Sequence, residues 1–291
     1  MQFFPLTCET YPLWLSFWEK TPFRTADTTF INLFGWAPVY GLEAAVEGDL
    51  FWIRRTRNGE SAFWTPLGDT RSVNWESALA PFPAGTRFER IPTDLALQMQ
   101  AGTERIADIT DTPEQHEYLY ERRALAEFSG RKLHKKRSHI NAFERLYGLD
   151  YRTLAVKDIP TITALSEAWL TAQTEPSAAL QSEHEALVRM LSLWQIDSSV
   201  RCGGLFYKNH LIGCDFGSAV NPTMFVIHIE KGLPEYRGVY PTLVKYFADR
   251  SIDPSFTLIN REQDLGDAGL RYSKTTYQPV DFVRKVALTL R

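Results

Sequence analysis

The sequence predicts two α/β domains, each with a mixed sheet and helices on its faces. The first observation is that both halves of the 291-residue chain follow one order: helix, antiparallel meander, helix, strand. The second is the turn chemistry between apolar runs, with Asn58-Gly59 in the first half and Lys208-Asn209 in the second. The third is a composition of 44% apolar and 23% charged residues, which is typical of packed globular proteins. We therefore expect one domain over residues 1–129 and another over residues 130–291.

The first half begins with an aromatic helix over Tyr11–Lys20. The elements expected after it are strands over Val39–Val46, Leu50–Arg57 and Ser61–Pro66, a helix near Val73–Ala80, a strand near Arg87–Ile91 and a helix from Asp94. Asn-Gly between two apolar runs predicts a hairpin, because both central residues of that turn need positive φ. An antiparallel meander is therefore expected here.

The second half repeats this order with different residues. We expect helices over Ile159–Gln173 and Glu183–Gln195, strands over Val200–Tyr207, His210–Ala219 and Thr223–Glu230, a helix over Arg237–Arg250, a strand over Phe256–Ile259 and a short helix over Gly266–Tyr272. Hairpins that lead into a strand–helix–strand step make a mixed sheet with helices on its faces. The repeated order indicates a structural duplication without obvious sequence identity.

A charged helical region joins the halves. Asp111-Thr112-Pro113 predicts a helix start and Ser129-Gly130 its end. In the helix expected next, Lys132, Lys135 and Lys136 share one face at 100° per residue. This face is either a solvated surface balanced by nearby glutamates or a patch that attracts RNA or another anion.

Composition and motifs exclude several protein classes. A net charge of -3 argues against a protein that coats nucleic acid non-specifically. The three cysteines have no CxxC spacing, so no metal site is predicted, and their sparse, odd count fits a reducing cytoplasm. The first residues lack the features of a secretory signal. No stretch approaches the roughly 20 apolar residues of a membrane span. We expect a cytoplasmic protein.

A dense polar run follows the last apolar strand of the second half. Asn260, Arg261, Glu262 and Asp264 come directly after Ile259. Polar residues at the carboxyl end of a sheet strand often line a ligand crevice. A strand–helix–strand step would place the strand that ends at Glu230 parallel and adjacent, so we expect these four residues to share a crevice with Glu230 and Lys231. The alternative is a structural corner, in which Arg261 pairs with a carboxylate and Asp264 caps a helix.

The loop between Glu230 and the following helix is a second candidate. Gly238 lies where that helix begins, and a glycine-containing loop at a helix start offers backbone N–H groups to phosphate. The guanidinium of Arg237 can add two hydrogen bonds to phosphate oxygens. Most strand–loop–helix joins contain something similar.

His228, in an apolar strand, is interpreted as a core histidine with satisfied hydrogen bonds.

These segments also resemble a known family. The matching stretches are Glu117-Tyr118-Leu119-Tyr120, residues 130–143, His228-Ile229-Glu230-Lys231, Gly238-Val239-Tyr240 and residues 260–271, continuing through Lys274 and Tyr277 to Pro279. Together they resemble the bacterial proteins related to the C-terminal domain of phosphatidylglycerol lysyltransferase, many of which have no assigned function. One departure is Lys136-Arg137-Ser138, where the family pattern usually has Lys-Arg-Asn.

The resemblance implies two tandem GNAT-like folds and transfer of an acyl or aminoacyl group. Lysyltransferase relatives take that group from aminoacyl-tRNA and pass it to a lipid. This chain lacks their membrane-spanning half, so the resemblance does not carry the lipid acceptor over. The segment Tyr236–Tyr240 is a poor version of the usual CoA pyrophosphate loop, which has more glycine, and this argues against ordinary acetyl-CoA chemistry. Aminoacyl-tRNA and acyl-CoA both stay open as the donor.

We expect acyl transfer to an amine or hydroxyl, which needs a positioned acceptor, a polarised carbonyl and a proton acceptor. Glu230 and Glu262 are the candidate bases, and Tyr240 and Tyr277 the candidate oxyanion donors. The candidate substrate contacts are Lys231, Arg237, Gly238, Asn260, Arg261, Asp264, Arg271, Lys274 and Tyr277. Two alternatives stay open: a non-catalytic ligand-binding module on the same scaffold, and a conventional CoA-dependent N-acetyltransferase.

Overall fold

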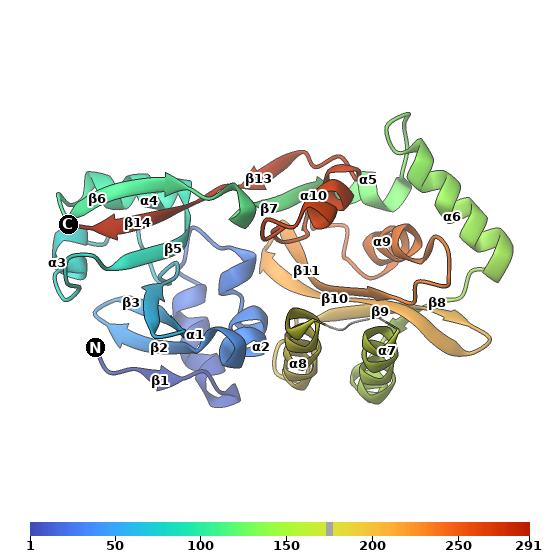
Figure 1. Cartoon of the computed structure of the whole chain (residues 1–291), viewed down its shortest axis with the longest axis horizontal. Coiled ribbons are helices and arrows are strands. Elements are labelled where there is room, and N and C mark those ends of the chain that lie inside the picture. Colours follow the sequence, from blue (N-terminus) through green and yellow to red (C-terminus); the bar gives the residue numbers. More distant parts are fainter. Residues whose placement is uncertain (173–176) are drawn as a thin grey trace. The chain divides into compact units, whose positions relative to one another are not determined.

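Two seven-stranded sheets organise the chain (Figure 1). The computed structural model describes residues 1–172 and 177–291. One compact unit comprises Met1–His116 with Val283–Arg291, and the other comprises Glu117–Phe282. This division differs from the boundary expected at Gly130, because the strand that begins at Glu117 pairs within the second sheet and the last strand of the chain pairs within the first.

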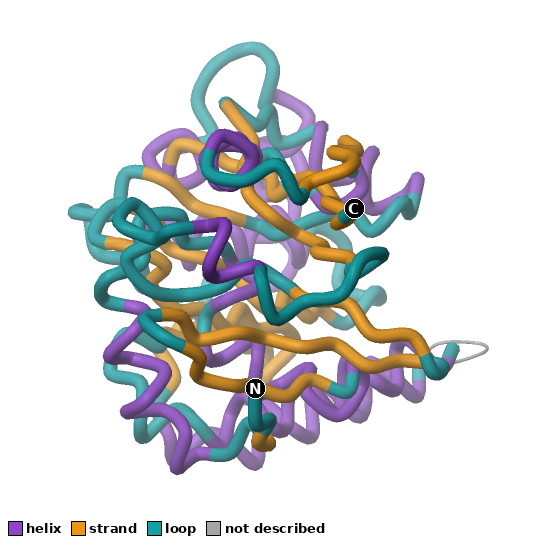
Figure 2. Tube along the Cα trace, turned by 90° about the vertical axis from the view of Figure 1, so that its left-hand side faces the viewer, coloured by secondary structure: helices purple, strands orange, loops and turns teal. Residues whose placement is uncertain are grey.

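The first unit contains the first sheet, with strand order β1-β2-β3-β4-β5-β14-β6. Its elements are β1 (Phe4–Pro5), η1 (Cys8–Thr10), α1 (Tyr11–Trp18), η2 (Ala26–Thr28), α2 (Phe30–Tyr40), β2 (Leu42–Glu47), β3 (Leu50–Arg57), β4 (Glu60–Phe63), α3 (Trp75–Leu79), β5 (Arg87–Pro92), α4 (Thr93–Ala101), β6 (Ile106–Asp111), η3 (Pro113–Gln115) and β14 (Lys285–Leu290). The alternation of helices, strands and loops can be followed in Figure 2.

Helix α2 was not expected from the sequence. The side chain of Thr29 caps it by accepting a hydrogen bond from the backbone N–H of Asn32, and Gly41 ends it in the left-handed conformation. A Cβ on Gly41 would lie 2.1 Å from the carbonyl oxygen of Thr56, so only glycine fits there. The strand predicted over Val39–Val46 therefore begins only at Leu42.

One core cluster of the first unit is rich in aromatic residues and lies on one face of its sheet. Trp52, Phe88 and Leu288, from three different strands, are fully buried together. The ring centroids of Trp52 and Phe82 are 4.9 Å apart in an edge contact, which is a favourable aromatic geometry. Successive side chains of a strand point to opposite faces, so the neighbours of these core residues along β3, β5 and β14 lie on the other face.

The second unit contains the second sheet, with strand order β13-β7-β12-β11-β10-β9-β8. Its elements are β7 (Glu117–Glu121), α5 (Arg122–Glu127), α6 (His134–Tyr147), β8 (Tyr151–Leu154), η4 (Val156–Asp158), α7 (Ile159–Thr171), α8 (Ala178–Ser192), β9 (Arg201–Tyr207), β10 (His210–Asn221), β11 (Met224–Gly232), α9 (Val239–Arg250), β12 (Leu258–Asn260), α10 (Ala268–Thr275) and β13 (Asp281–Val283). The end predicted for α7, at Gln173, lies outside the described residues.

Helices cover both faces of the second sheet (Figure 1). Helix α9 packs on β9, β10 and β11 and contacts α5 and α6, whereas α7 packs on β10 and β11 and contacts α8. Helix α6 has a buried apolar face with Ile140 and Phe143, and Leu133 is buried just before its first residue. Among the described residues, no helix has both the length and the apolar character needed to cross a bilayer.

The single helix predicted between Asp111 and Gly130 is wrong. The Thr112-Pro113 start leads only into the short 3-10 helix η3, after which the chain forms strand β7 and the short helix α5. In β7 the side chains of Tyr118, Leu119 and Tyr120 are all buried. A strand covered on both faces accepts such a run, whereas an exposed connecting helix would leave part of it in water.

The parallel step predicted in the second half is confirmed. Strands β11 and β12 pair in parallel, with Val226 opposite Asn260, while β9, β10 and β11 form the expected antiparallel meander. The carboxyl ends of β11 and β12 therefore point the same way. The polar residues that follow each strand are brought to one edge of the sheet.

Candidate functional site

An ion pair links the ends of the two parallel strands. The guanidinium Nη2 of Arg261, just after β12, donates to the carboxylate Oε2 of Glu230 in β11 over 2.8 Å. Both side chains are largely buried, with exposed fractions of 10% and 17%. Burial lowers the pKa of Arg261, but the carboxylate of Glu230 outweighs it and raises that pKa overall. Arg261 is therefore a fixed cation at this edge of the sheet.

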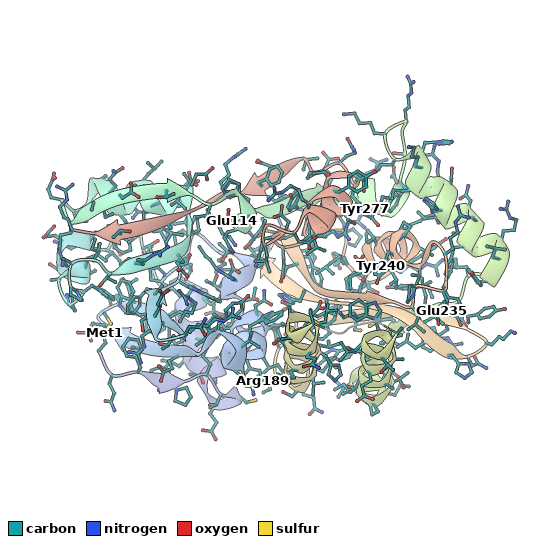
Figure 3. All side chains as sticks on the ribbon, viewed as in Figure 1. Met1, Glu114, Arg189, Glu235, Tyr240 and Tyr277 are labelled. Atoms are coloured by element: carbon teal, nitrogen blue, oxygen red, sulfur yellow. The ribbon has the colours of Figure 1, made fainter. Side chains whose placement is uncertain are left out.

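Aromatic rings surround this cation. The Cζ atom of Arg261 lies 4.3 Å from the ring centroid of Tyr277, which follows α10, and 5.6 Å from that of Tyr120 in β7. The ammonium of Lys136 in α6 lies 3.9 Å from the same Tyr277 centroid. These distances are those of cation–π contacts. Figure 3 labels Tyr277 next to α10 and Tyr240 on α9.

Asp215 in β10 lies beside this ion pair and is the most unusual residue of the group formed by Asp215, Glu230, Arg261 and Lys136, which we call the cluster. It lies directly opposite Glu230 in the antiparallel register and is fully buried. Neither of its carboxylate oxygens has a hydrogen-bond partner among the described residues, and the same holds for Nη1 of Arg261. Burial and the charge of Glu230 raise the pKa of Asp215 well above its usual range. Since nearly all buried polar groups in proteins are hydrogen-bonded, these three atoms mark a place for a polar ligand.

Two lysines at the cluster have lowered pKa values. Burial, with a further contribution from the nearby charge of Arg261, lowers the pKa of Lys136 and that of Lys274 to about 8. Lys274 is held in place, because its ammonium donates to the carbonyl oxygen of Gln263 over 2.7 Å and also to that of Arg261. Lys136 has no hydrogen bond of this kind among the described residues. Its amine is the more available proton acceptor.

A buried chain of hydrogen bonds runs from Ser218 through His228 to Glu262. The ring Nε2 of His228 lies 2.8 Å from the hydroxyl of Ser218, and Nδ1 lies 2.9 Å from Oε1 of Glu262. Ser218 and the His228 side chain are completely buried, so the hydroxyl cannot reach a substrate as a nucleophile. His228 has satisfied hydrogen bonds, as expected from the sequence. Its contact orients Glu262, whose backbone has a φ of 55°.

Comparison with known proteins places this chain in a family. The family described as "Phosphatidylglycerol lysyltransferase, C-terminal" matches residues 18–288. The chain belongs to this family.

Solved structures of similar proteins agree with the fold. A conserved protein of unknown function from Bacteroides thetaiotaomicron VPI-5482 is 25% identical, with a TM-score of 0.88 and 100% of both chains covered. L-PGS from Bacillus licheniformis is 13% identical, with a TM-score of 0.67 over 96% of this chain and 91% of that chain. The predicted fold class is confirmed: this member of the lysyltransferase C-terminal family is a mixed α/β protein of the tandem GNAT-like type.

An uncharacterized protein of Mycoplasmoides gallisepticum (strain R(low / passage 15 / clone 2)) is 29% identical over 172 residues, which are 58% of this chain. The match covers 54% of that relative, so the chain spans about half the length of the curated relative it matches.

Some predicted site residues of this family member form a separate, structural corner. Asp264 accepts two hydrogen bonds from Arg271 and one from Tyr118. Burial raises the pKa of Asp264, but these hydrogen bonds outweigh it and bring that pKa to about 2. The amide of Asn260 is buried against Glu117. The corner alternative is right that Arg261 pairs with a carboxylate, that of Glu230. It is wrong about the helix cap, because α10 is capped by the side chain of Asp267 and not by that of Asp264.

Lys231 does not join the crevice predicted with Glu230. Its ammonium donates to Glu183 over 2.6 Å and lies 3.4 Å from the ring centroid of Trp169, in contact with helices α8 and α7. Adjacent residues of a strand point to opposite faces, so Lys231 and Glu230 separate. The hydroxyl of Tyr240 accepts from the indole of Trp169 over 3.1 Å, and this contact ties Tyr240 to the Lys231 group.

In both the loop before α9 and the basic helix α6, some of the predicted site residues are exposed and others are packed against the protein. Arg237 is exposed, and Gly238 packs against α6, where a Cβ would lie 2.6 Å from the carbonyl oxygen of His139. Lys132 and Lys135 are exposed, whereas Lys136 is half-buried at Tyr277. The shared lysine face predicted from helical spacing therefore does not act as one surface.

Asp215 was missed by sequence reasoning. Its signal was a lone acidic residue in the apolar strand His210–Ala219, which the flanking turns place beside the strand that ends at Glu230.

Proposed function

We propose that this protein transfers an aminoacyl group from aminoacyl-tRNA to an amine or hydroxyl acceptor, at the cluster formed by Asp215, Glu230, Arg261 and Lys136. The observation that carries the proposal is the set of unpartnered buried atoms, the two carboxylate oxygens of Asp215 and Nη1 of Arg261. Two acceptors and one donor are the complement of an aminoacyl ester, which has an ammonium group and a carbonyl oxygen. A simple acetyl group has no ammonium for Asp215.

The chemistry follows from these groups. The ammonium of the aminoacyl group donates to Asp215, which ionises by releasing its proton to solvent, and the ester carbonyl accepts from Nη1 of Arg261. A fixed donor aimed at this oxygen stabilises the negative charge that develops on it in the transition state. Glu230 holds the guanidinium in position. The buried surroundings strengthen each of these interactions.

Lys136 supplies the proton acceptor. An amine with a pKa of about 8 is partly neutral near physiological pH, which is the range in which a general base is efficient. The acceptor nitrogen or oxygen forms a bond to the carbonyl carbon while its proton passes to the Lys136 amine. The bond from that carbon to the 3′-terminal ribose oxygen of the tRNA breaks, and this oxygen takes the proton.

Acyl-CoA fits the structure less well as a donor. Pyrophosphate binding needs open backbone N–H groups at the start of α9. Here the backbone N–H of Val239 donates to the carbonyl of Tyr236, and Gly238 is in close contact with α6. Arg237 is exposed beside this closed turn. These contacts favour the aminoacyl donor over CoA.

The test is a transfer assay with purified protein, tRNA charged with labelled amino acids, and labelled acetyl-CoA as the competing donor. We expect loss of label from the charged tRNA in the presence of amine or hydroxyl acceptors, and no transfer from acetyl-CoA. Lys136→Met should lower the rate by about 100-fold or more, since general bases contribute about 10²–10⁴-fold. Arg145→Met, on the same helix, exposed and outside the lysine face, is the matched control and should keep the wild-type rate.

A binding module would give a different result. It would retain charged tRNA without transfer, and Lys136→Met would change nothing. Transfer from acetyl-CoA alone would instead establish conventional acetyltransferase chemistry.

A further inference from the structure

The first unit has a cavity of its own that the sequence reasoning did not identify. It measures about 240 Å³ and lies on the face of the first sheet opposite the aromatic core. Four arginines line it: Arg55 and Arg57 from β3, and Arg87 and Arg90 from β5. We call it the arginine pocket. All of its lining residues belong to the first unit, so it is independent of the site proposed for transfer.

A β-bulge builds one wall of the arginine pocket. Val286 pairs with Ile91 and Leu288 with Phe88, so Glu89 and Arg90 together lie opposite the single residue Ala287. Arg90 has a φ of 59°, in the left-handed region that arginine seldom adopts. In a regular strand Glu89 and Arg90 would point to opposite faces, yet both line the cavity, as does Ala287. Bulges of this kind re-aim side chains next to binding sites.

Two of the arginines are fixed by partners. Arg55 donates to both carboxylate oxygens of Glu89 over 3.0 and 3.1 Å. Arg90 donates to the buried Asp27, and its Cζ atom lies 4.2 Å from the ring centroid of Trp64. These two guanidinium groups form a rigid, preorganised part of the lining. Preorganised groups bind a ligand without a further loss of side-chain freedom.

The other two arginines have no carboxylate partner. Arg57 and Arg87 are exposed, and no carboxylate in the described part of the chain lies within ion-pair distance of either. The lining holds four guanidinium groups against the two carboxylates of Glu89 and Glu114, and Glu89 is already taken by Arg55. The excess positive charge points to an anionic ligand.

The geometry points to a phosphate ester, because a guanidinium can donate two parallel hydrogen bonds to phosphate oxygens. On the η3 side, Glu114 (labelled in Figure 3) and Gln115 offer acceptors, and the side-chain oxygen of Gln115 is buried with no hydrogen-bond partner within the described residues. Hydrogen-bond acceptors beside a phosphate-binding site can accept from hydroxyl groups of the molecule that carries the phosphate. The volume is below that of a pocket for a drug-sized ligand.

We propose that the arginine pocket binds a sugar phosphate, with Arg57 and Arg87 on the phosphate and the Glu114–Gln115 side on the sugar hydroxyls. This chemistry is available from a free sugar phosphate or from a ribose-phosphate unit of an RNA strand.

The test is isothermal titration of the full-length protein with three probes: ribose 5-phosphate, ribose and a short single-stranded RNA. We expect ribose 5-phosphate or the RNA to bind and ribose alone to bind far more weakly. The double variant Arg57→Gln/Arg87→Gln should lower the affinity about tenfold or more, a change of about 1.4 kcal/mol. The matched control is Lys20→Gln/Arg71→Gln, which removes two exposed positive charges elsewhere in the first unit and should change affinity less than about twofold.

A second variant separates the cavity from general electrostatic attraction. Ala287→Leu fills the pocket without changing its charge and should also abolish binding of ribose 5-phosphate. If the RNA binds and ribose 5-phosphate does not, the ligand of the pocket is an RNA strand. If both bind, the pocket recognises the ribose-phosphate unit that the two probes share. If neither ribose 5-phosphate nor the RNA binds, or if either Ala287→Leu or the arginine double variant binds them like wild type, the proposal is overturned.

Discussion

Two buried aspartates, one in each unit, show opposite ways of placing a carboxylate inside a protein. Asp27 in the first unit is 3% exposed and is held by both Arg90 and Lys285. Asp215 in the second unit is fully buried and has no partner among the described residues. The pKa values diverge accordingly. Burial raises the pKa of Asp27, but its two cations outweigh burial and lower that pKa, whereas burial and Glu230 raise the pKa of Asp215.

The difference in partners between Asp27 and Asp215 indicates a structural role for one and a ligand-binding role for the other. A buried charge with complete partners stabilises the arrangement of those partners, and its removal leaves them uncompensated. A buried carboxyl without partners destabilises the folded state. Such a group is expected at a site where a bound substrate provides the missing hydrogen-bond partners. We therefore interpret Asp27 as a structural residue of the first sheet and Asp215 as a ligand-binding residue of the second.

The largest effect should come from Asp27→Asn. This change leaves the ammonium of Lys285 and the guanidinium of Arg90 buried without their carboxylate. Breaking a buried ion pair by removing one partner typically destabilises a protein by about 3–5 kcal/mol. The free energy of unfolding, measured by urea denaturation at neutral pH, should fall by this amount. Asp215→Asn in the same experiment should be neutral or stabilising, and a loss as large as that of Asp27→Asn would remove the distinction.

The pH dependence of stability should have opposite signs at the two aspartates. An unfolded aspartate has a pKa of about 3.9. Folded Asp215 keeps its proton above that pH while the unfolded chain releases it, so wild type should lose stability relative to Asp215→Asn as pH rises, by up to about 1.4 kcal/mol per pH unit. Folded Asp27 stays ionised, so its contribution should be constant at neutral pH and lost as pH falls below about 4.

Urea denaturation of wild type and both variants from about pH 2 to pH 8 measures these trends, because the window must extend on both sides of the unfolded-state pKa of about 3.9. A wild-type advantage over Asp215→Asn that grows with pH would mean that Asp215 is ionised and paired in the folded protein.

The smallest effect should come from the exposed lysines of α6. Lys132→Gln/Lys135→Gln should leave the free energy of unfolding within about 0.5 kcal/mol of wild type, as is usual for surface substitutions. If these lysines contact tRNA phosphates, the dependence of log affinity on log salt should flatten by about one unit for each lost contact. Filter binding over a range of salt concentrations measures this slope. An unchanged slope would assign the exposed part of this face to solvent alone, and Lys136 would then be its only functional member.

Sequence patterns were sufficient for the parts of the site that depend on local signals. The apolar run of Phe256–Ile259 followed by polar residues predicted the crevice edge, and the strand–helix–strand rule predicted its parallel neighbour. Alternation in Val286, Leu288 and Leu290 signalled a final strand that we did not predict. Its pairing with β5, far away in the chain, depends on contacts that no local pattern contains.

Other features of the sites are not predictable from the sequence because they depend on the register of paired strands. The opposition of Asp215 and Glu230 follows from a hairpin that contains a register shift between Phe216 and Gly217. The bulge at Glu89 and Arg90 depends likewise on the pairing of β5 with β14. Helical spacing predicted that Lys136 shares a face with Lys132 and Lys135. In the structure only Lys136 contacts the ring of Tyr277 and is half-buried.

The central claim is that Asp215 recognises the ammonium group of an aminoacyl donor. The most direct measurement compares the dissociation constants of aminoacylated and deacylated tRNA for wild type and for Asp215→Asn. Wild type should bind the aminoacylated form more tightly, and Asp215→Asn should lose that preference while its affinity for deacylated tRNA stays the same. A hydrogen bond to a charged group contributes about 1.5–3 kcal/mol, which corresponds to a preference of about tenfold or more. Equal preference in the two proteins would contradict the account.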